Sequence, residues 1–277
     1  MKRTPEARGG TRAITSLQNE RVKLIRSLEM RKARRETGLF VAEGASVLIS
    51  ARDAGWKPTI LVFLAGSASA GIHRDLLGWA EAAGAECLEV SEPVLAKLAA
   101  KDNPQTMLAT FEQRWHDAPD PGAMAPDALW LALEGVRDPG NLGTIVRTAD
   151  AVGASGVMLV GNCVDPYSRE AVRASMGSIF SVPFVRLTQE QCLALVARWP
   201  GDIAGTRLDA REDFRIARYR APALLLMGSE GPGLSADLSA ACTRLVKIPM
   251  AGRLDSLNLA VATALMLYEM RKERLRL

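Results

Sequence analysis

Histidine is nearly absent from this sequence, which has only His73 and His116 among its 277 residues. A mechanism that depends on a histidine base, or on a metal held by several histidines, is therefore disfavoured. The four cysteines lie far apart, with neither a CxxC pair nor a metal-ligand spacing, so we expect no zinc site and no disulfide framework. Cysteines of this kind are typical of the reducing cytoplasm, which is the location that we expect.

Long apolar runs are missing as well. No stretch approaches the ~20 residues that a membrane-spanning helix needs. The first ten residues are polar and basic, unlike a secretory signal, so we expect neither export nor a membrane partner. The remaining composition, with 48% hydrophobic and 24% charged residues, is typical of a globular chain with a sizeable core.

Positive charge is concentrated at the front of the chain. Residues 1–35 contain eleven basic and three acidic residues, a charge of +8, whereas the whole chain carries +4, so the rest sums to −4. A basic front on a mildly acidic body favours a polyanionic partner such as nucleic acid. The alternative is a solvated helix that only keeps the protein soluble, and charge alone does not separate the two.

Apolar strands alternate with helical segments along the chain, which predicts an α/β fold. We expect a flexible tail over residues 1–11 and a first α/β domain over 12–113, with a basic helix from about Ser16 to Arg35. Residues 114–127, with three prolines and three aspartates, are typical of a linker. Residues 128–277 form a second α/β domain, whose continuous apolar strands predict a largely parallel sheet covered on both faces.

The first of three glycine-rich segments, residues 134–150, joins a strand to a helix. We expect the Pro139–Gly140 pair to form the turn and Asn141 to cap the helix. Ligands of open α/β sheets bind at such junctions. Arg147 lies among apolar residues of this helix, and an arginine held there suggests a phosphate or oxyanion partner. The alternative is a well-capped helix start with Arg147 on the surface.

The second segment, residues 224–234, is a buried-type strand that ends in a loop with three glycines. Such a loop lets the backbone approach a ligand closely. It matches neither GxGxxG nor GxxxxGK[ST], and Glu230 at its centre would repel phosphate, so a neutral or cationic ligand is favoured. The alternative is a tight turn without a ligand.

The third segment, residues 248–269, begins as a strand end and a loop, after which we expect Ser256 to cap a helix that is apolar nearly all round. A helix of this kind is normally buried on all sides, and this one is too short to cross a membrane. It fits either a subunit interface or the central core of a monomer.

Taken in order, DPGNLGTIVRTADAVG, LLLMGSEGPGL and IPMAGRLDSLNLAVATALMLYE resemble the three motifs of the SpoU (TrmH) family of RNA 2′-O-ribose methyltransferases, and RASMGSIFSVPF between the first two also matches. The stretch from ITSLQNERVKLIRSL through GLFVAEGASVL to NPQTMLA is similar to the family's optional substrate-binding domain, a small α/β domain that resembles a ribosomal protein. The resemblance covers about residues 12–274.

The resemblance implies methyl transfer from S-adenosylmethionine to a ribose 2′-OH. It also implies a homodimer whose α/β catalytic domain has a deep C-terminal trefoil knot of the SPOUT type. Ribosomal RNA is the favoured substrate because of the front domain. Transfer RNA is one alternative, and a catalytically silent RNA-binding or ribosome-assembly factor is another. By position, the resemblance implies catalytic roles for Asn141, Arg147, Glu230, Ser256 and Asn258, and cofactor binding by Gly228, Ile248, Met250 and Leu257.

A base role for Arg147 is chemically awkward, because a guanidinium with a pKa above ~12 rarely loses its proton. We expect Arg147 instead to bind the RNA phosphate and to lower the pKa of the hydroxyl, while Asn141 and Glu230 orient that hydroxyl. No cysteine lies in the three motifs, so covalent attack on a pyrimidine ring is unsupported. No acidic cluster suggests a metal ion.

Overall fold

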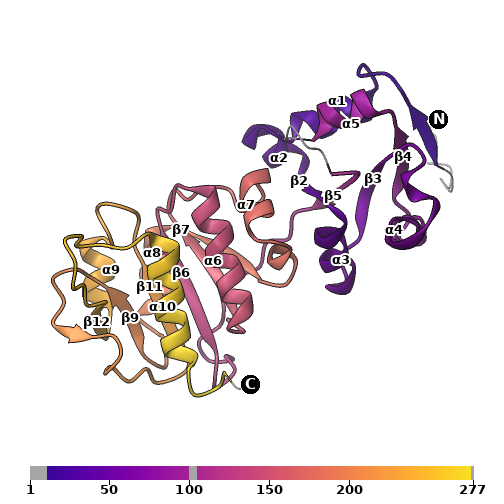
Figure 1. Ribbon diagram of the computed structural model, residues 1–277. Helices are drawn as coiled ribbons and strands as arrows, with labels where there is room; N and C mark the ends of the chain where they lie inside the picture. Colours follow the sequence, from indigo (N-terminus) through magenta and orange to yellow (C-terminus); the bar gives the residue numbers. More distant parts are fainter. Residues whose placement is uncertain (1–10, 100–104, 276–277) are drawn as a thin grey trace. The chain divides into compact units, whose positions relative to one another are not determined.

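The computed structural model describes residues 11–99 and 105–275. Contacts within the chain divide it into two compact units (Figure 1). The first holds the described residues up to Gln113 together with Tyr167–Phe180, and the second holds Arg114–Pro166 and the chain from Ser181 onward. The boundaries expected from the sequence assigned Tyr167–Phe180 to the second domain, whereas the contacts of this segment group it with the first.

The first unit is built on a five-stranded sheet with the order β1-β4-β3-β5-β2. Strands β1, β4 and β3 are parallel, and β5 runs antiparallel to both β3 and β2. Its strands are β1 (Arg12–Ile14), β2 (Leu39–Glu43), β3 (Pro58–Leu64), β4 (Glu86–Val90) and β5 (Met107–Glu112). Its α-helices are α1 (Glu20–Ser27), α2 (Arg31–Thr37), α3 (Ala45–Asp53), α4 (Gly71–Ala82), α5 (Glu92–Leu98) and α7 (Arg169–Ala174).

The described part of the basic front, residues 11–35, is part of this unit and not a separate arm. Strand β1 pairs with β4, and Val22, Ile25 and Leu28 are fully buried in the core. The expected tail lies outside the described residues except for its last one. The single helix expected up to Arg35 is two helices, α1 and α2. The buried Arg34 donates from Nη1 to the carbonyls of Leu28 and Glu29 at 2.8 Å each, so these carbonyls have a hydrogen-bond partner where α1 ends.

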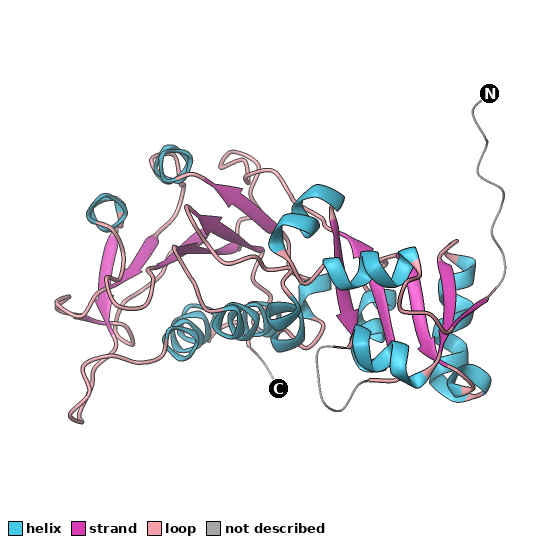
Figure 2. Cartoon of the chain, turned by 90° about the horizontal axis from the view of Figure 1, so that it is seen from above, coloured by secondary structure: helices cyan, strands magenta, loops and turns pink. Residues whose placement is uncertain are grey.

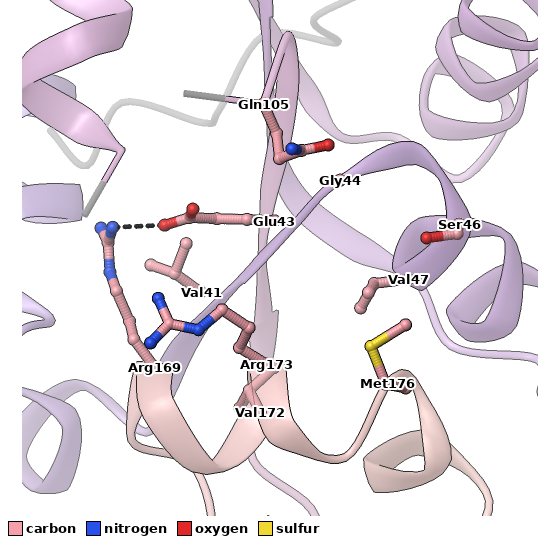
Figure 3. Close-up of a pocket in the computed structure, with 10 residues that line it drawn as sticks. All are labelled: Val41, Glu43, Gly44, Ser46, Val47, Gln105, Arg169, Val172, Arg173 and Met176. Atoms are coloured by element: carbon pink, nitrogen blue, oxygen red, sulfur yellow. Dashed lines mark hydrogen bonds and ion pairs between the residues drawn. The ribbon is translucent and has the colours of Figure 1, made fainter. Parts of the chain in front are cut away.

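Helix α7 belongs to the first unit through a buried arginine. The side chain of Arg169 is 6% exposed, and its Nε lies 2.6 Å from a carboxylate oxygen of Glu29. Its Nη1 lies 2.5 Å from the carboxylate of Glu43 (Figure 3). The same Nη1 donates to the carbonyl of Leu98 at 2.6 Å. A cavity of about 200 Å³ opens beside this pair. A buried charge is tolerated only when it is paired in this way.

Aromatic packing completes the first unit around the same segment. The ring centroid of Phe40 in β2 lies 4.6 Å from that of Tyr167 and 6.0 Å from that of Phe180. Trp56 donates from its indole nitrogen to the carbonyl of Phe180 at 2.8 Å. Residues 167–180 therefore supply one wall of a core whose other walls come from the first 113 residues.

The second unit is an α/β layer structure with a seven-stranded sheet in the order β10-β12-β9-β11-β6-β7-β8. Every strand pairing in it is parallel, which confirms the largely parallel sheet predicted from the apolar strands. Helices lie on both faces of this sheet (Figure 2). The strands are β6 (Leu129–Glu134), β7 (Gly156–Val160), β8 (Phe184–Leu187), β9 (Ile203–Thr206), β10 (Glu212–Asp213), β11 (Ala223–Met227) and β12 (Arg244–Lys247). The α-helices are α6 (Pro139–Ala151), α8 (Gln189–Val196), α9 (Ala236–Ala241) and α10 (Leu259–Arg271).

The segment expected to be a linker starts on the edge of this sheet. The backbone nitrogen of His116 donates to the carbonyl of Phe184 in β8 at 2.8 Å. The ring of Trp115 packs edge-on against that of Phe184, and the guanidinium carbon of Arg186 lies 3.5 Å from the centre of the Trp115 ring. Proline and aspartate content predicted an irregular segment but not that its first residues would be held in place. In the described parts of the chain, no helix has the length and apolarity needed to cross a membrane.

Candidate active site

Three loops meet where strands of the second unit end. Strand β6 ends at Glu134, β11 at Met227 and β12 at Lys247, and each is followed by one of the three glycine-rich segments. Strands β6 and β11 are direct neighbours, and β9 separates β11 from β12. Because the carboxyl ends of parallel strands lie at one edge of a sheet, the three segments converge there, as ligand sites of open α/β sheets do.

A hydrogen-bonded chain of three side chains joins these loops. Asn258 donates from Nδ2 to Oδ1 of Asn141 at 2.9 Å, and Asn141 donates from Nδ2 to Oε1 of Glu230. These residues are 117 and 89 positions apart in sequence, so only the fold brings them together. Three of the five side chains predicted to be catalytic therefore form one group, and in it a carboxylate accepts from an amide that is itself oriented by a second amide.

Asn258 has two functions in this arrangement. Its Oδ1 accepts from the backbone nitrogens of Ala260 at 2.9 Å and Val261 at 3.3 Å, which caps helix α10. This leaves Nδ2 to donate across to Asn141, so the helix cap also fixes the orientation of the amide. The prediction that Ser256 caps the helix is wrong. Ser256 lies two residues earlier, exposed in the loop before α10.

Asn141 is held from its backbone side as well. Helix α6 starts at Pro139 with Asp138 as its cap, and the backbone nitrogen of Asn141 donates to Oδ1 of Asp138 at 2.6 Å. The prediction that Asn141 is the cap is therefore wrong by three positions. The sequence contained the signal, because an aspartate followed by proline is typical of a helix start. Because Asp138 caps the helix, the side-chain oxygen of Asn141 is not used for capping and accepts from Asn258 instead.

The loop after β11 is shaped by backbone and not by side chains. Gly228 is buried, and a Cβ added there would lie 1.9 Å from the carbonyl carbon of Gly233 and 2.1 Å from the nitrogen of Leu234. The loop closes on itself through the backbone nitrogen of Gly233, which donates to the carbonyl of Ser229 at 3.1 Å. Gly231 and Gly233 both have positive φ, at 97° and 73°, which glycine adopts without strain.

Glu134 is a residue whose position matters although the sequence analysis gave it no role. It is the last residue of β6, and its Oε2 accepts from the backbone nitrogen of Ser235 at 2.8 Å. Strand β6 therefore anchors the end of the Gly228–Leu234 loop. Ser235 in turn caps helix α9. The signal available in the sequence was the acidic residue at a strand end, but its partner 101 residues away was not predictable.

Arg147 is not brought into the hydrogen-bonded group. It is exposed on α6, and its guanidinium makes no hydrogen bond or ion pair with any residue that the structure describes. The apolar residues beside it in sequence, Ile145, Val146 and Ala149, are buried on the opposite side of the helix. Arg147 lies six positions after Asn141 in the α-helix, which places it about 9 Å further along the axis and about a third of a turn away around it. The guanidinium is therefore available to an external anion.

The predicted cofactor-binding side chains surround the loops with apolar surface. Ile248 and Met250 are half-buried after β12, and Leu257 is 37% exposed. Leu254 in the same loop is 74% exposed. Closely spaced backbone groups around Gly228 and an apolar rim without excess charge suit a flat, nearly neutral ligand with a single cationic centre, for which Glu230 supplies the opposite charge.

The thiols of Cys192 and Cys242 are not poised as nucleophiles. Burial, with Glu134 as a smaller contribution, raises the pKa of Cys192 to about 11, and burial raises that of Cys242 to about 12. Both thiols therefore stay protonated near neutral pH. In the parts of the chain that the structure describes, no group of three His, Cys, Asp or Glu side chains is placed to hold a metal ion.

Two family models match the chain, one over each of its two α/β parts. The SpoU rRNA Methylase family matches residues 128–268, and the MRM3-like substrate binding domain matches residues 19–109. The fold and the site thus define a SpoU-type methyltransferase domain together with a substrate-binding domain. The chain belongs to the SpoU rRNA methylase family.

Relatives and solved structures extend over nearly the whole chain. A crystal structure described as an AdoMet-bound rRNA methyltransferase from Sinorhizobium meliloti shares 42% identity and covers 96% of this chain and 99% of its own, with a TM-score of 0.87. An uncharacterized tRNA/rRNA methyltransferase from Synechocystis sp. is 34% identical over 95% of this chain and 94% of its own. The 23S rRNA (uridine(2479)-2′-O)-methyltransferase of Streptomyces viridochromogenes is 32% identical over 99% and 95%.

Proposed function

We propose that this protein transfers a methyl group from S-adenosylmethionine to a ribose 2′-hydroxyl of ribosomal RNA. The observation that carries the proposal is the hydrogen-bonded chain from Asn258 through Asn141 to Glu230, located where the three motif loops meet. The activity printed for the Streptomyces relative, a 23S rRNA 2′-O-methyltransferase, supports the same reaction class. The intact chain of side chains disfavours a catalytically silent RNA-binding factor.

The residues that would hold the cofactor are Gly228, Ile248, Met250 and Leu257. Gly228 allows the loop to close tightly, so that backbone groups and not side chains face the ligand. Ile248, Met250 and Leu257 supply apolar contacts for a purine and ribose. When bound, the cofactor supplies an electrophilic methyl group on its sulfonium.

The other residues act on the acceptor. Asn141 and Glu230 orient the ribose hydroxyl, and most of the rate gain in an in-line displacement comes from such alignment. Arg147 binds the adjacent phosphate and stabilises negative charge that develops on the 2′-oxygen. Arg147 does not act as the base, since a guanidinium stays protonated at any physiological pH. The hydroxyl proton passes to water as the bond between the 2′-oxygen and the methyl carbon forms and the bond from that carbon to sulfur breaks. Ser256, exposed at the edge of the same loop, contacts the RNA nucleotide.

The first unit supplies substrate choice. Its match to a substrate-binding domain and the exposed basic residues of its first two helices support an RNA partner. Structured ribosomal RNA is the substrate that we favour over transfer RNA, because residues 19–109 match a substrate-binding domain and a relative of nearly full coverage is named a 23S rRNA 2′-O-methyltransferase. We place the protein in the cytoplasm, where four free cysteines fit the reducing environment.

Helix α10 supports a homodimer. One face of α10 is buried, including Thr263, Met266 and Leu267, but Val261, Leu265 and Tyr268 are 50%, 40% and 51% exposed. These three residues lie four and three positions apart, so they form one apolar stripe along the helix. The helix is therefore not the fully buried core helix of a monomer, and we propose that a second copy of the chain covers the stripe.

The proposal is tested in two steps. Calorimetric titration with S-adenosylmethionine should show binding by the wild-type protein and loss of binding in Leu257→Arg, which blocks the pocket. Radiolabelled methyl transfer to ribosomal and transfer RNA, followed by mapping of 2′-O-methyl groups, should then give product on ribosomal RNA. Product on transfer RNA alone would correct the substrate, and binding without any product on either RNA would contradict the reaction.

A further inference from the structure

An open groove of about 970 Å³ lies at the other edge of the second unit's sheet. It is lined by the amino ends of β6 and β11, by residues 215–221 of the loop that precedes β11, and by the last turn of α10. Strand β6 has six residues, so at ~3.4 Å per residue the groove is roughly 17 Å from the edge that carries Asn141. The groove is therefore separate from the candidate active site.

The groove carries an excess of positive charge. Seven basic and four acidic side chains line it, so it has three positive charges in excess. Much of this charge is internally paired. Arg274 pairs with Asp127, and Lys272 pairs with Glu269. Arg215 pairs with Asp213, and Arg244 pairs with Asp202 and Glu212. Asp213 and Glu212 lie outside the lining, and counting them lowers the excess to one positive charge.

Two arginines of the loop before β11 remain available. Arg218 makes no hydrogen bond or ion pair within the described ranges 11–99 and 105–275. The side chain of Arg220 is 73% exposed and reaches only to 4.0 Å from a carboxylate oxygen of Asp202. Beside them, Ile216 is 78% exposed. An arginine guanidinium without a protein partner is suited to bidentate contact with a phosphate.

The loop that carries these arginines has a fixed backbone. Phe214 and Ala217 are buried, and the hydroxyl of Tyr219 donates to the carbonyl of Phe214 at 2.8 Å. The backbone of Arg220 is held by Asp202 on both sides, because its nitrogen donates to Oδ2 at 2.8 Å and its carbonyl accepts from the Asp202 nitrogen at 2.9 Å. A ligand would therefore meet arginines on an ordered loop, and it would not have to order that loop on binding.

We propose that this groove binds the phosphate backbone of the RNA substrate at a distance from the nucleotide that reacts. The inference rests on the proposed function, since it takes RNA as the substrate. The unpaired Arg218 and the loosely paired Arg220 on a rigid loop, an open shape and an excess of positive charge suit a polyanion that extends beyond the groove. Because the groove reads charge and not base edges, it adds affinity without changing the choice of nucleotide.

The test is a full-length double variant, Arg218→Ala with Arg220→Ala, in a binding titration against a ribosomal RNA transcript over a series of salt concentrations. We expect the Kd at low salt to rise about tenfold, and the slope of log Kd against log salt to become shallower by about 1 to 2 units, because each lost phosphate contact removes close to one unit. The pair Arg218→Lys with Arg220→Lys should retain most of the slope, because lysine still neutralises phosphate.

A matched control keeps the result interpretable. Arg198→Ala with Arg207→Ala removes two accessible arginines of the same unit that do not line the groove, and it should leave Kd and slope unchanged. A double variant at Arg218 and Arg220 with wild-type Kd and slope would overturn the proposal. Cofactor binding and thermal unfolding are measured on the same variants. Failure of the wild type to bind S-adenosylmethionine or to methylate RNA would count against the proposed function, and it would leave the salt slope as an independent result.

Discussion

The two edges of the second unit's sheet are chemically opposite. At the carboxyl edge, three segments meet through side-chain amides, one carboxylate and a glycine loop. At the amino edge, arginines from a single loop and the end of one helix line an open groove with acidic neighbours. The aligned side chains of the carboxyl edge come from segments far apart in sequence. The positive charge that attracts a polyanion at the amino edge comes largely from neighbouring residues of one loop. We therefore assign the reaction to the carboxyl edge and binding of the RNA backbone to the amino edge.

Asn141→Ala should separate the two edges most clearly. The change removes both hydrogen bonds that join Asn258 to Glu230, so we expect methyl transfer at saturating substrates to fall about 10² to 10³-fold, as when a preorganised hydrogen-bonding group is removed. The Kd for RNA and its salt slope should stay within twofold of wild type. Thr148→Ala, on an exposed turn of the same helix, is the control in single-turnover assays. Turnover of Asn141→Ala close to wild type would remove the catalytic role.

Gly228→Ala tests whether the carboxyl edge depends on backbone shape. The added methyl group would lie 1.9 Å from the Gly233 carbonyl carbon, so the loop has to move, and we expect S-adenosylmethionine affinity to drop at least about tenfold by calorimetry. Gly78→Ala, which meets no atom within 4 Å, serves as the control and should bind normally. RNA affinity should be unchanged in both variants. Equal cofactor affinity in Gly228→Ala and wild type would place the cofactor elsewhere.

Helix α10 connects the two edges, since Asn258 caps it at one edge and Arg271 ends it at the other. Leu265→Glu with Val261→Glu puts charges on its apolar stripe, and we expect the particle mass in light scattering to fall by half as the dimer dissociates. Leu208→Glu places the same charge at another exposed apolar residue and should leave the mass unchanged. A wild-type protein that already has the mass of one chain would contradict the homodimer.

The smallest effect is expected from the basic front of the first unit. Arg26→Ala with Arg35→Ala removes two exposed charges and should weaken RNA binding about threefold, with a slope that is shallower by about 1 to 2 units. Deletion of residues 1–35 is a poorer experiment, because it also removes Val22, Ile25 and Leu28 from the core and should unfold the first unit. No change in RNA affinity for the double variant would leave the front without a role in binding. A larger loss here than at Arg218 and Arg220 would reverse the assigned order of the two surfaces.

Much of the fold could be predicted from local patterns. Continuous apolar runs such as Gly156–Val160 and Ala223–Met227 are strands of the second unit, as the predicted parallel sheet covered on both faces requires. Helix caps were less predictable. Ser256 and Asn258 are both good caps, and Asn258 is the one that also reaches Asn141 across the site.

Long-range contacts explain what could not be predicted. Arg147 has apolar neighbours in sequence, but it lies on the exposed side of α6. The sequence alone did not show which side of this helix packs against the rest of the unit. Tyr167–Phe180 has the local pattern of any helix in an α/β domain, and nothing within it indicates that Arg169 pairs with Glu29 and Glu43. The motif resemblance named Asn141, Glu230 and Asn258, but not the hydrogen bonds that connect them.

The return of the chain at Tyr167–Phe180 has a consequence for how the protein is made. A nascent chain that has been translated only to Gln113 lacks the partners of Phe40 and Trp56, so the core of its first unit has an open side until residue 180 emerges. The front unit therefore cannot finish folding before about a third of the second has been synthesised. For the same reason, a fragment cut after Gln113 would expose that aromatic surface and invite aggregation, which makes the full chain the smallest sound starting point for studying RNA recognition.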